Sequence, residues 1–346
     1  MFKKLVTIVL VMLMSFLLAG CGGSSGGEEK KSAGGDGTYT IKIGSPVVET
    51  HPAHNGFLKF IELVEKNSNG KIKAELHANG VLGGDRELTE AVQMGTVTMT
   101  LSSTSPVANF EKSFYLFDLP FLFPDRETAY KVLDGPIGQK LLDNLASQGI
   151  KGLGYWENGF RHITNSKRSI NKLEDIKGLK LRTMENQLHM AAWKQLDANP
   201  TPMAFGEVFT ALQQGTVDGQ ENPLALIDSN KFYEANKYLT LSGHIYTPFV
   251  IMMNKKFFDE LPQDLQKVVL DAVKEAGQYQ RDLMKQQEEK SLKVIKDAGC
   301  VVTELPTEEK AKMVEALKPV YDKGAEMMGG RQLIDELMAE VEKVKK

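Results

Sequence analysis

The strongest constraint on the fold of this chain is a regular alternation of strand-like and helix-like segments that begins at residue 38. Residues 38–46 alternate apolar and polar side chains, as a half-buried strand does, and a helical apolar face follows over residues 54–68. Two more strand-like segments, KIKAELHANG and VTMTLSST, enclose a helix that begins after paired glycines. Strands joined by helices through short links predict an α/β fold with a mostly parallel sheet.

A second series of such segments begins near residue 159 and predicts a second lobe. Residues 243–253 form a charge-free, strand-like run, and a helix of roughly 36 residues, about 54 Å long, is expected after Pro262. Because that length exceeds the diameter of one domain, the helix is expected to run along both lobes. We therefore expect two lobes with a ligand cleft between them, composed of residues 38–158 plus 248–287 and of residues 159–247 plus 288–346.

The first 21 residues have the pattern of an export signal. Lys3 and Lys4 precede an apolar run over residues 5–18 that is short for a bilayer span, so residues 1–20 are expected to be a signal peptide. The Leu-Ala-Gly-Cys ending resembles a bacterial lipobox, which predicts a lipidated Cys21 and a flexible, lipid-anchored linker over residues 21–37. A plain signal peptide followed by a chance cysteine is the alternative. The folded part would lie outside the cytoplasm, in the periplasm or on the outer face of the cell membrane.

Composition and motifs count against several other classes of function. The net charge is −3 without a basic block, and such a balance disfavours nucleic-acid binding. Two cysteines cannot build a disulfide framework or a thiolate metal cage, and the spacing of His51 and His54 matches no familiar zinc motif. The sequence contains no nucleophile elbow and no glycine loop that follows a strand and would bind phosphate. We therefore expect neither an enzyme nor a bound metal or cofactor.

Polar side chains at the ends of the expected strands favour the binding of an anion. Arg182 ends the strand-like segment 177–183 just before a helix expected to start near Glu185, so a guanidinium and a helix N-terminus would meet there. Arg161 follows an aromatic run at the end of another strand, and Asn222 lies between a strand and a proline. A surface salt bridge for Arg161 and a strand-end cap for Asn222 are the alternatives. Together, these groups indicate a site for a carboxylate.

Four segments of the chain resemble motifs of one protein family. They are LGGDREL, GFRHITNSKR, GLKLRT and NPTPMAFGEVFTALQQGTVDGQENPLALIDSNKFYEANKYL, which occur in this order between residues 82 and 239. They are similar to segments of the DctP-type solute-binding proteins of tripartite ATP-independent periplasmic (TRAP) transporters, and the resemblance covers residues 39–346. It implies a periplasmic-binding-protein-like fold and an extracytoplasmic protein that hands a small carboxylate to the small and large membrane subunits of a permease.

The same resemblance implies which residues contact the ligand. Arg182 would pair with the ligand carboxylate, Asn222 would contact the same carboxylate, and Phe205 would pack on the ligand. Arg161 would supply a second contact, as in some members of the family. The first lobe would contribute two residues near the ligand, Asp85 and Ser103. Position alone adds three candidate selectors of hydroxyl groups or carbon skeleton, namely Glu185, Trp156 and His51.

The motif positions also bear on which ligand is bound. Ser45-Pro46 and Ser103 stand where some sialic-acid-binding members carry an asparagine and a ligand-facing glutamate, which counts against sialic acid. An arginine, an asparagine and polar partners such as Glu185 and Asp85 suit a hydroxylated acid, for example a uronate or another sugar acid. A C4-dicarboxylate is the alternative ligand, because Arg161 would hold its second carboxylate. A ligand sensor for a membrane histidine kinase and an anchored extracytoplasmic enzyme are the alternative functions.

Overall fold

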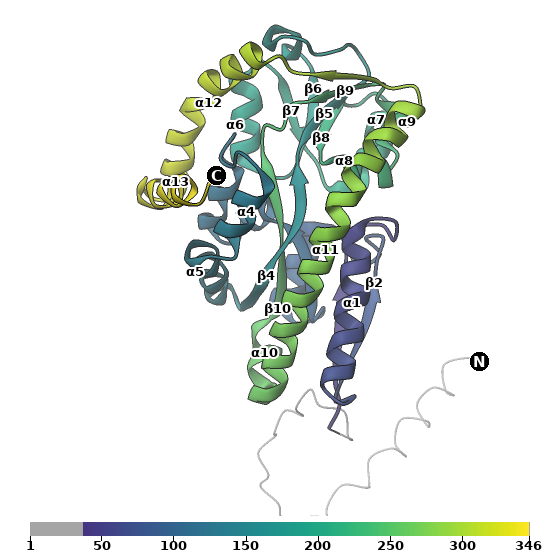
Figure 1. Ribbon diagram of the computed structural model, residues 1–346, viewed down its shortest axis with the longest axis vertical. Coiled ribbons are helices and arrows are strands. Elements are labelled where there is room, and N and C mark those ends of the chain that lie inside the picture. The colour runs from purple at the N-terminus through teal and green to yellow at the C-terminus, as the bar shows by residue number, and fades with distance from the viewer. Residues whose placement is uncertain (1–36, 346) are drawn as a thin grey trace, which may run out of the picture. The chain divides into compact units, whose positions relative to one another are not determined.

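The computed structural model describes residues 37–345, and within that range it shows an α/β fold with two separate sheets (Figure 1). The expected signal peptide (1–20), Cys21 and all but the last residue of the expected linker (21–37) lie outside the described residues. The two sheets confirm the expectation that residues on either side of about position 159 do not form one continuous sheet.

The first sheet combines parallel and antiparallel strands. Its members are β1 (Tyr39–Gly44), β2 (Ile72–His77), β3 (Met99–Ser103), β4 (Ile150–Phe160) and β10 (Tyr246–Asn254). The order is β2-β1-β3-β10-β4, in which β1 pairs in parallel with both neighbours, as the strand–helix alternation predicted. β10 lies antiparallel between β3 and β4. Its side chains are buried on both faces up to Met253, which explains the charge-free sequence.

Helices of very different length cover this first sheet and its edges. They are α1 (Pro52–Asn67), α2 (Asp85–Met94), α3 (Thr104–Val107), α4 (Arg126–Leu133), α5 (Pro136–Asn144) and α10 (Lys255–Glu260), with the 3-10 turns η1 (Lys112–Asp118) and η2 (Leu145–Gln148). α1 starts where the His51 side chain accepts a hydrogen bond from the Ala53 N–H and Pro52 occupies the first turn. Its apolar face, which includes Phe57 and Phe60, is buried in the core.

The second sheet is built from short strands. Its members are β5 (His162–Asn165), β6 (Lys180–Thr183), β7 (Asn199–Pro202), β8 (Gly219–Asn222), β9 (Tyr238–Leu241) and β11 (Val301–Glu304), in the order β11-β9-β5-β8-β6-β7. The helical segments around it are α6 (Gln187–Gln195), α7 (Val208–Gln213), α8 (Leu224–Ser229) and α9 (Phe232–Ala235), with the 3-10 turns η3 (Leu173–Ile176) and η4 (Phe205–Glu207). The sequence pattern did not predict β5, β9 or β11.

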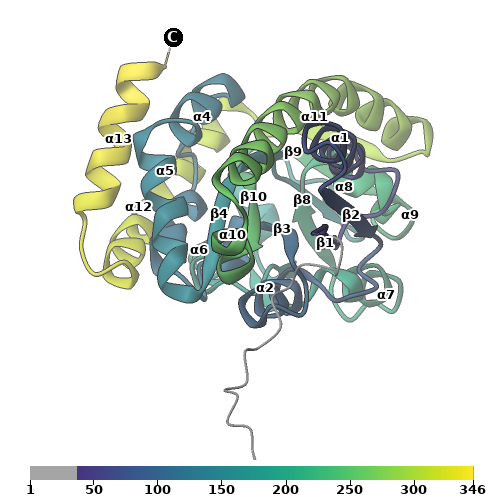
Figure 2. The same ribbon diagram turned by 90° about the horizontal axis from the view of Figure 1, so that it is seen from below.

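Three segments connect the two sheets: the step from β4 to β5, the step from β9 to β10, and the long helix α11 (Gln263–Asp297). α11 has 35 residues and packs against α1 and β4 on one side of the molecule and against α8 on the other, as Figures 1 and 2 show. Gly56 of α1 and Gly277 of α11 let these helices approach the Trp156 ring, since a Cβ atom at either position would lie within 3 Å of it. The expected long helix along both lobes is therefore present.

The chain ends in α12 (Thr307–Met327) and α13 (Gln332–Val344). α12 packs on α6 beside the second sheet, whereas α13 packs on α4, which precedes β4. Phe117, Leu188 and Leu317 belong to one apolar core that joins these elements. Within residues 37–345, no helix combines the length and apolarity needed to cross a bilayer.

Candidate ligand-binding site

Five of the residues expected at the site line one small cavity. Ser103 is the last residue of β3, Asn222 is the last of β8, and Arg182 is the last but one of β6. These polar groups therefore lie where strands end, which is the usual place for ligands in α/β folds. Asp85 from the start of α2 and Phe205 from η4 complete this set. The remaining walls are apolar: Pro46, Val47, Met184, Leu226 and Phe249.

Among the residues that the structure describes, Arg182 carries the one cation that lines this cavity. Its side chain is buried, and its Nε and Nη2 atoms donate to the Met203 carbonyl oxygen at 3.0 and 2.7 Å. Nη1 is also buried and has no hydrogen-bond partner among the described residues. Burial, followed by the repulsion from Arg161, lowers the pKa of Arg182 to about 10, so the guanidinium remains charged at neutral pH. The arrangement leaves a buried positive charge with a free N–H, which suits an anion.

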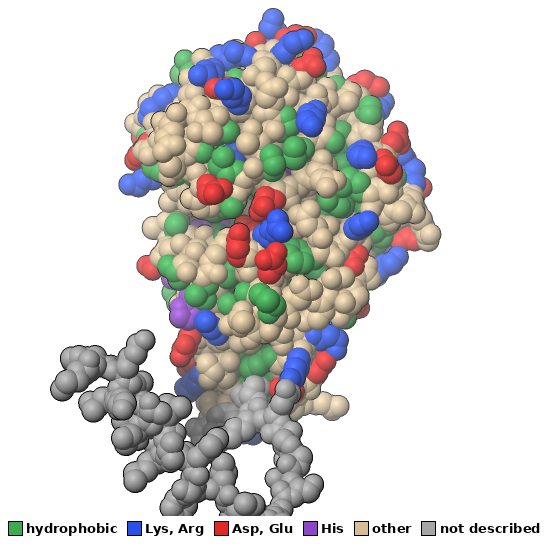
Figure 3. All heavy atoms as spheres, turned by 180° about the vertical axis from the view of Figure 1, so that it is seen from behind, with side chains coloured by type: hydrophobic (Ala, Val, Ile, Leu, Met, Phe, Trp, Pro, Cys, Tyr) green, Lys and Arg blue, Asp and Glu red, His purple; other side chains and the backbone are tan. Residues whose placement is uncertain are grey.

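On the face shown in Figure 3, acidic and basic side chains are interspersed, so this face has no predominantly basic surface. A buried group such as Arg182 can attract an anion more strongly than a surface group, because the low dielectric constant of the interior strengthens the interaction.

The side of the cavity next to β3 offers hydrogen-bonding oxygens. Asp85 Oδ1 accepts hydrogen bonds from the Ser102 hydroxyl at 3.0 Å and from the Ser103 N–H at 2.8 Å. Burial is the largest influence on Asp85 and raises its pKa against the opposing effect of these bonds and of Arg182. Beside it, Asn158 Nδ2 donates to Ser103 Oγ at 3.1 Å, while Asn158 Oδ1 is buried without a partner among the described residues. These groups can bind hydroxyl groups.

Arg161 does not line the cavity, but it contacts Asn222, which does. It is fully buried, and its guanidinium donates through Nε and Nη2 to the Glu221 carboxylate and through Nη2 to Asn222 Oδ1 at 3.0 Å. His244 Nε2 lies 3.2 Å from Glu221 Oε2. Burial opposes ionisation of Glu221, but Arg161 and the hydrogen bond from His244 outweigh it and hold the pKa of Glu221 below its usual range. The charge of Arg161 is therefore already compensated, and Arg161 orients Asn222.

Glu185 lies at the edge of the site. It lines an adjoining narrow hollow together with Arg182 and Phe205. Its carboxylate is 3.6 Å from Arg86 Nη1 of α2, and its backbone oxygen accepts from Asn109 Nδ2 at 2.6 Å. Glu185 thus lies near the arginine of the cavity and contacts two residues that precede β4.

The structure does not bring Trp156 or His51 to the cavity wall. Trp156 of β4 lies in the core, where its ring packs against Phe57 with centroids 5.0 Å apart and its Nε1 donates to the Val273 carbonyl oxygen of α11. His51 caps α1 and meets Phe249 edge-on with ring centroids 6.0 Å apart. Both are therefore core residues, and His51 acts on the cavity only through Phe249. Among residues 37–345, no group of metal-binding side chains is present around His51 and His54.

Sequence reasoning missed three residues of this region: Asn158, Glu221 and His244. Asn158 follows Trp156 near the end of β4, so the rule that identified Arg182 and Asn222 would also have identified it. Glu221 stands directly before Asn222, but no pattern shows that it pairs with Arg161, which is 60 residues away. His244 lies in an irregular link before β10 and gave no signal.

Comparisons with known proteins place the chain in a family. A family model described as bacterial extracellular solute-binding protein, family 7 (DctP) matches residues 43–327. The sugar acid binding protein DctPAm of Advenella mimigardefordensis, solved in complex with galactonate, is 43% identical with a TM-score of 0.87, and the alignment covers 89% of this chain and 99% of that one. A solute-binding protein of Verminephrobacter eiseniae is 47% identical over 75% of this chain and 77% of its own. The C4-dicarboxylate-binding periplasmic protein DctP of Rhodobacter capsulatus is 38% identical over 85% of this chain and 88% of its own.

The family consists of extracytoplasmic binding proteins for small carboxylates that work with membrane permease subunits in TRAP transport, and not of enzymes. The family model spans most of the chain, and each of the three relatives is more than a third identical along most of its own length. On these grounds, the chain belongs to family 7 of the bacterial extracellular solute-binding proteins, the DctP family of TRAP transporters.

Proposed function

We propose that this protein is a membrane-anchored solute-binding lipoprotein that captures a small molecule through its carboxylate and delivers it to a TRAP-type permease. The observation that supports this most is the buried Arg182 guanidinium with its unpartnered Nη1. A carboxylate in the cavity would accept a hydrogen bond from Nη1 and would supply the counter-charge that Arg182 lacks. Asn222 Nδ2 donates one hydrogen to Gln220 Oε1, and its second hydrogen is suited to the same carboxylate.

The polar groups favour a ligand with one carboxylate and several hydroxyl groups, such as a sugar acid or a uronate. Arg161 is paired with Glu221 and therefore adds no free positive charge for a second carboxylate. Asp85 and Ser103 offer oxygens to hydroxyl groups, and Phe205 offers a ring face to the carbon skeleton. The relative from Advenella mimigardefordensis, which binds galactonate, supports the same class of ligand.

A C4-dicarboxylate is the second candidate ligand. The observation that favours it is Arg161 Nη1, which is also buried without a partner among the described residues. The relative from Rhodobacter capsulatus is named as a C4-dicarboxylate-binding protein. A second carboxylate would have to share Arg161 with Glu221, and this is why the sugar acid is preferred.

The proposal includes the division into lobes. We assign residues 38–158, 248–287 and 332–345 to the first lobe and residues 159–247 plus 288–331 to the second. The sequence had placed α13 in the second lobe, but we assign it to the first because it packs on α4.

The proposal also includes the lipid anchor. Cys21 would carry the lipid, so Cys21→Ser is expected to release a protein that still binds its ligand. Retention of that variant at the membrane would contradict the anchor.

The function is tested by a thermal-shift screen of purified protein over D-galactonate, D-galacturonate, D-gluconate, succinate and L-malate. Galactitol is the matched control, since it keeps the hydroxyl groups of galactonate and lacks the carboxylate. A ligand at 100 times its Kd stabilises the protein by about 2.7 kcal/mol. We expect a sugar acid to give the largest shift, galactitol to give none, and mass spectrometry to recover the bound ligand unchanged. A shift with galactitol as large as with galactonate, or chemical conversion of the ligand, would contradict the proposal.

A further inference from the structure

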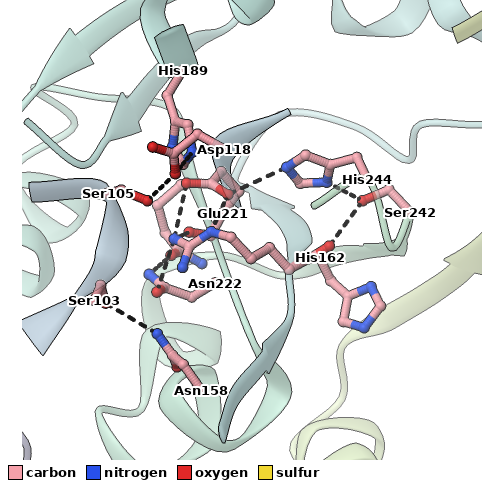
Figure 4. A network of polar contacts seen from close by, with 12 residues as sticks. Ser103, Ser105, Asp118, Asn158, His162, His189, Glu221, Asn222, Ser242 and His244 are labelled. Atoms are coloured by element: carbon pink, nitrogen blue, oxygen red, sulfur yellow. Dashed lines mark hydrogen bonds and ion pairs between the residues drawn. The ribbon is translucent and has the colours of Figure 1, made fainter. Parts of the chain in front are cut away.

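A buried polar cluster away from the cavity wall joins the two proposed lobes. Asp118, at the end of η1, accepts hydrogen bonds from Asn186 Nδ2 at 2.7 Å and from the Ser105 hydroxyl, and its Oδ1 lies 3.0 Å from His189 Nε2. We call these four residues, all of which are buried, the Asp118 cluster. Figure 4 shows Asp118 between Ser105 and His189. Ser105 and Asp118 belong to the first proposed lobe, whereas Asn186 and His189 lie at the start of α6 in the second.

The two residues of this cluster that belong to the second proposed lobe, Asn186 and His189, lie shortly after Arg182 in the chain. Asn186 is four residues after Arg182 and forms the N-cap of α6, where its Oδ1 accepts from the Leu188 and His189 N–H groups at 2.9 Å. Its Nδ2 also donates to the Ser105 carbonyl oxygen at 2.9 Å. The end of β6 and the first turn of α6 are therefore held against the first lobe within a few residues of Arg182.

The chemistry of the cluster requires the two lobes to be together. A buried carboxylate is stable only while its oxygens accept hydrogen bonds, and two of the three side-chain partners of Asp118 come from the other lobe. Separation of the lobes would remove both partners at once, and water would have to replace them.

We propose that Asp118 is a positioning residue for ligand capture, which holds the start of α6, and with it Arg182, in place when the cleft is closed. This inference rests on the proposed lobe division and on the proposed binding function. Asp118 acts through Asn186 and His189 and does not line the cavity. Its hydrogen bonds favour the closed arrangement before any ligand contributes.

The variant Asn186→Asp tests this inference without removing the helix cap, because Asp is as good an N-cap as Asn. It replaces the donor to Asp118 with a second carboxylate, and two carboxylates that share one site cannot both be ionised without repulsion. Closure of this variant should therefore depend on pH. The other titratable groups around the cluster are His189, Tyr115 of η1, and the Arg161, Glu221 and His244 side chains that lie beyond His189.

The measurement is the distribution of distances between two spin labels in the ligand-free protein. The labels are attached at Val81→Cys and Thr210→Cys, two exposed positions in different proposed lobes. The native cysteines are removed by Cys21→Ser and Cys300→Ser. Relative to the parent protein, Asn186→Asp should lower the ratio of closed to open molecules by about tenfold at about pH 8, and should recover it at about pH 5, where one proton is shared. The exchange Asp118→Asn with Asn186→Asp should restore closure at the higher pH. Because no ligand is present, the result does not depend on which ligand the protein binds.

The matched control is Asn254→Asp. Asn254 caps α10 with its Oδ1 and donates from Nδ2 to the Val92 carbonyl oxygen, but both contacts lie within the first lobe. This variant should leave the closed population unchanged at both pH values. If Asn186→Asp does not fold, His189→Leu removes the second donor to Asp118, and His189→Gln keeps one. Equal closed populations in the parent, the Asp118-cluster variants and the control would overturn the inference, as would a loss of closure that neither low pH nor the exchanged pair restores.

Discussion

Two buried arginines of the second lobe differ in what neutralises them. Arg161 is paired with Glu221, which His244 contacts in turn, so this region carries its own counter-charge. Within residues 37–345, Arg182 donates only to the Met203 carbonyl oxygen and has no partner for Nη1, and it lines the cavity. The first arginine is thus neutralised within the protein, whereas we propose that the second is neutralised by the carboxylate of the ligand.

The contrast shows how a site can be selective and still stable. A buried charge without a partner lowers the free energy of unfolding, so a protein retains few of them. Here the cost is confined to Arg182, while the Arg161 region orients Asn222 at the cavity wall. Each prediction below separates the two regions, beginning with the largest expected effect.

Glu221→Gln should show the largest effect on stability. It removes the counter-charge of fully buried Arg161, and loss of one member of a buried pair costs about 3–5 kcal/mol of the free energy of unfolding. Urea unfolding of the ligand-free protein measures this. Glu315→Gln is the control, because Glu315 pairs with Lys318 on the exposed surface and should matter by less than about 1 kcal/mol. Equal losses in the two variants would mean that Arg161 is not dependent on Glu221.

Acidification should weaken the folded state through buried histidines, among them His51 and His162. Burial lowers the pKa of His51 and, together with His244, Lys310 and Arg161, that of His162 to about 3, whereas the unfolded chain titrates near pH 6.5. The unfolded state therefore binds more protons between about pH 6.5 and pH 3, so stability falls as the pH falls, by at most about 1.4 kcal/mol per unit for each histidine.

Unfolding curves at about pH 7 and about pH 5 check this dependence on the two histidines. His51→Asn keeps a cap for α1, and His162→Gln keeps an acceptor for the Gly243 N–H. Each variant should lose part of the pH dependence. A slope unchanged in both variants would show that these histidines are not the groups that titrate.

Trp156→Phe should have the smallest effect on ligand affinity. The ring packs between α1 and α11 and donates to the Val273 carbonyl oxygen, so the variant should lose about 1 kcal/mol of stability through that hydrogen bond. The Kd of the ligand should stay within about twofold. A tenfold rise in Kd at unchanged stability would show that Trp156 does contribute to ligand binding.

Local patterns in the sequence predicted the parallel part of the first sheet, the long helix and the polar residues at strand ends. They did not predict that β10 inserts antiparallel between β3 and β4, because pairing between distant strands is decided by tertiary packing. Irregular register between β10 and β4 also breaks the simple alternation of faces, which explains why the direction of Trp156 was not predictable.

At the site, the resemblance to a known family led to Arg182 and Asn222, and the structure brings them to one cavity. The same motif contains Glu221, but its pairing with Arg161 joins segments 60 residues apart and leaves no local signal. Which of two arginines is free for a ligand is therefore a property of the fold and could not be predicted from the spacing of the residues.

The measurement that tests the central claim most directly is calorimetric titration of Arg182→Ala with the tightest-binding acid of the panel. Arg168→Ala is the matched control, because Arg168 of the same lobe also donates to backbone carbonyl oxygens but is partly exposed and lies away from the cavity. Loss of one member of a buried ion pair costs about 3–5 kcal/mol, so Arg182→Ala should weaken binding by about 10² to 10³ or more, with Arg182→Lys intermediate. Arg168→Ala should bind as the parent protein does. An Arg182→Ala protein that binds with the parent affinity would contradict the account.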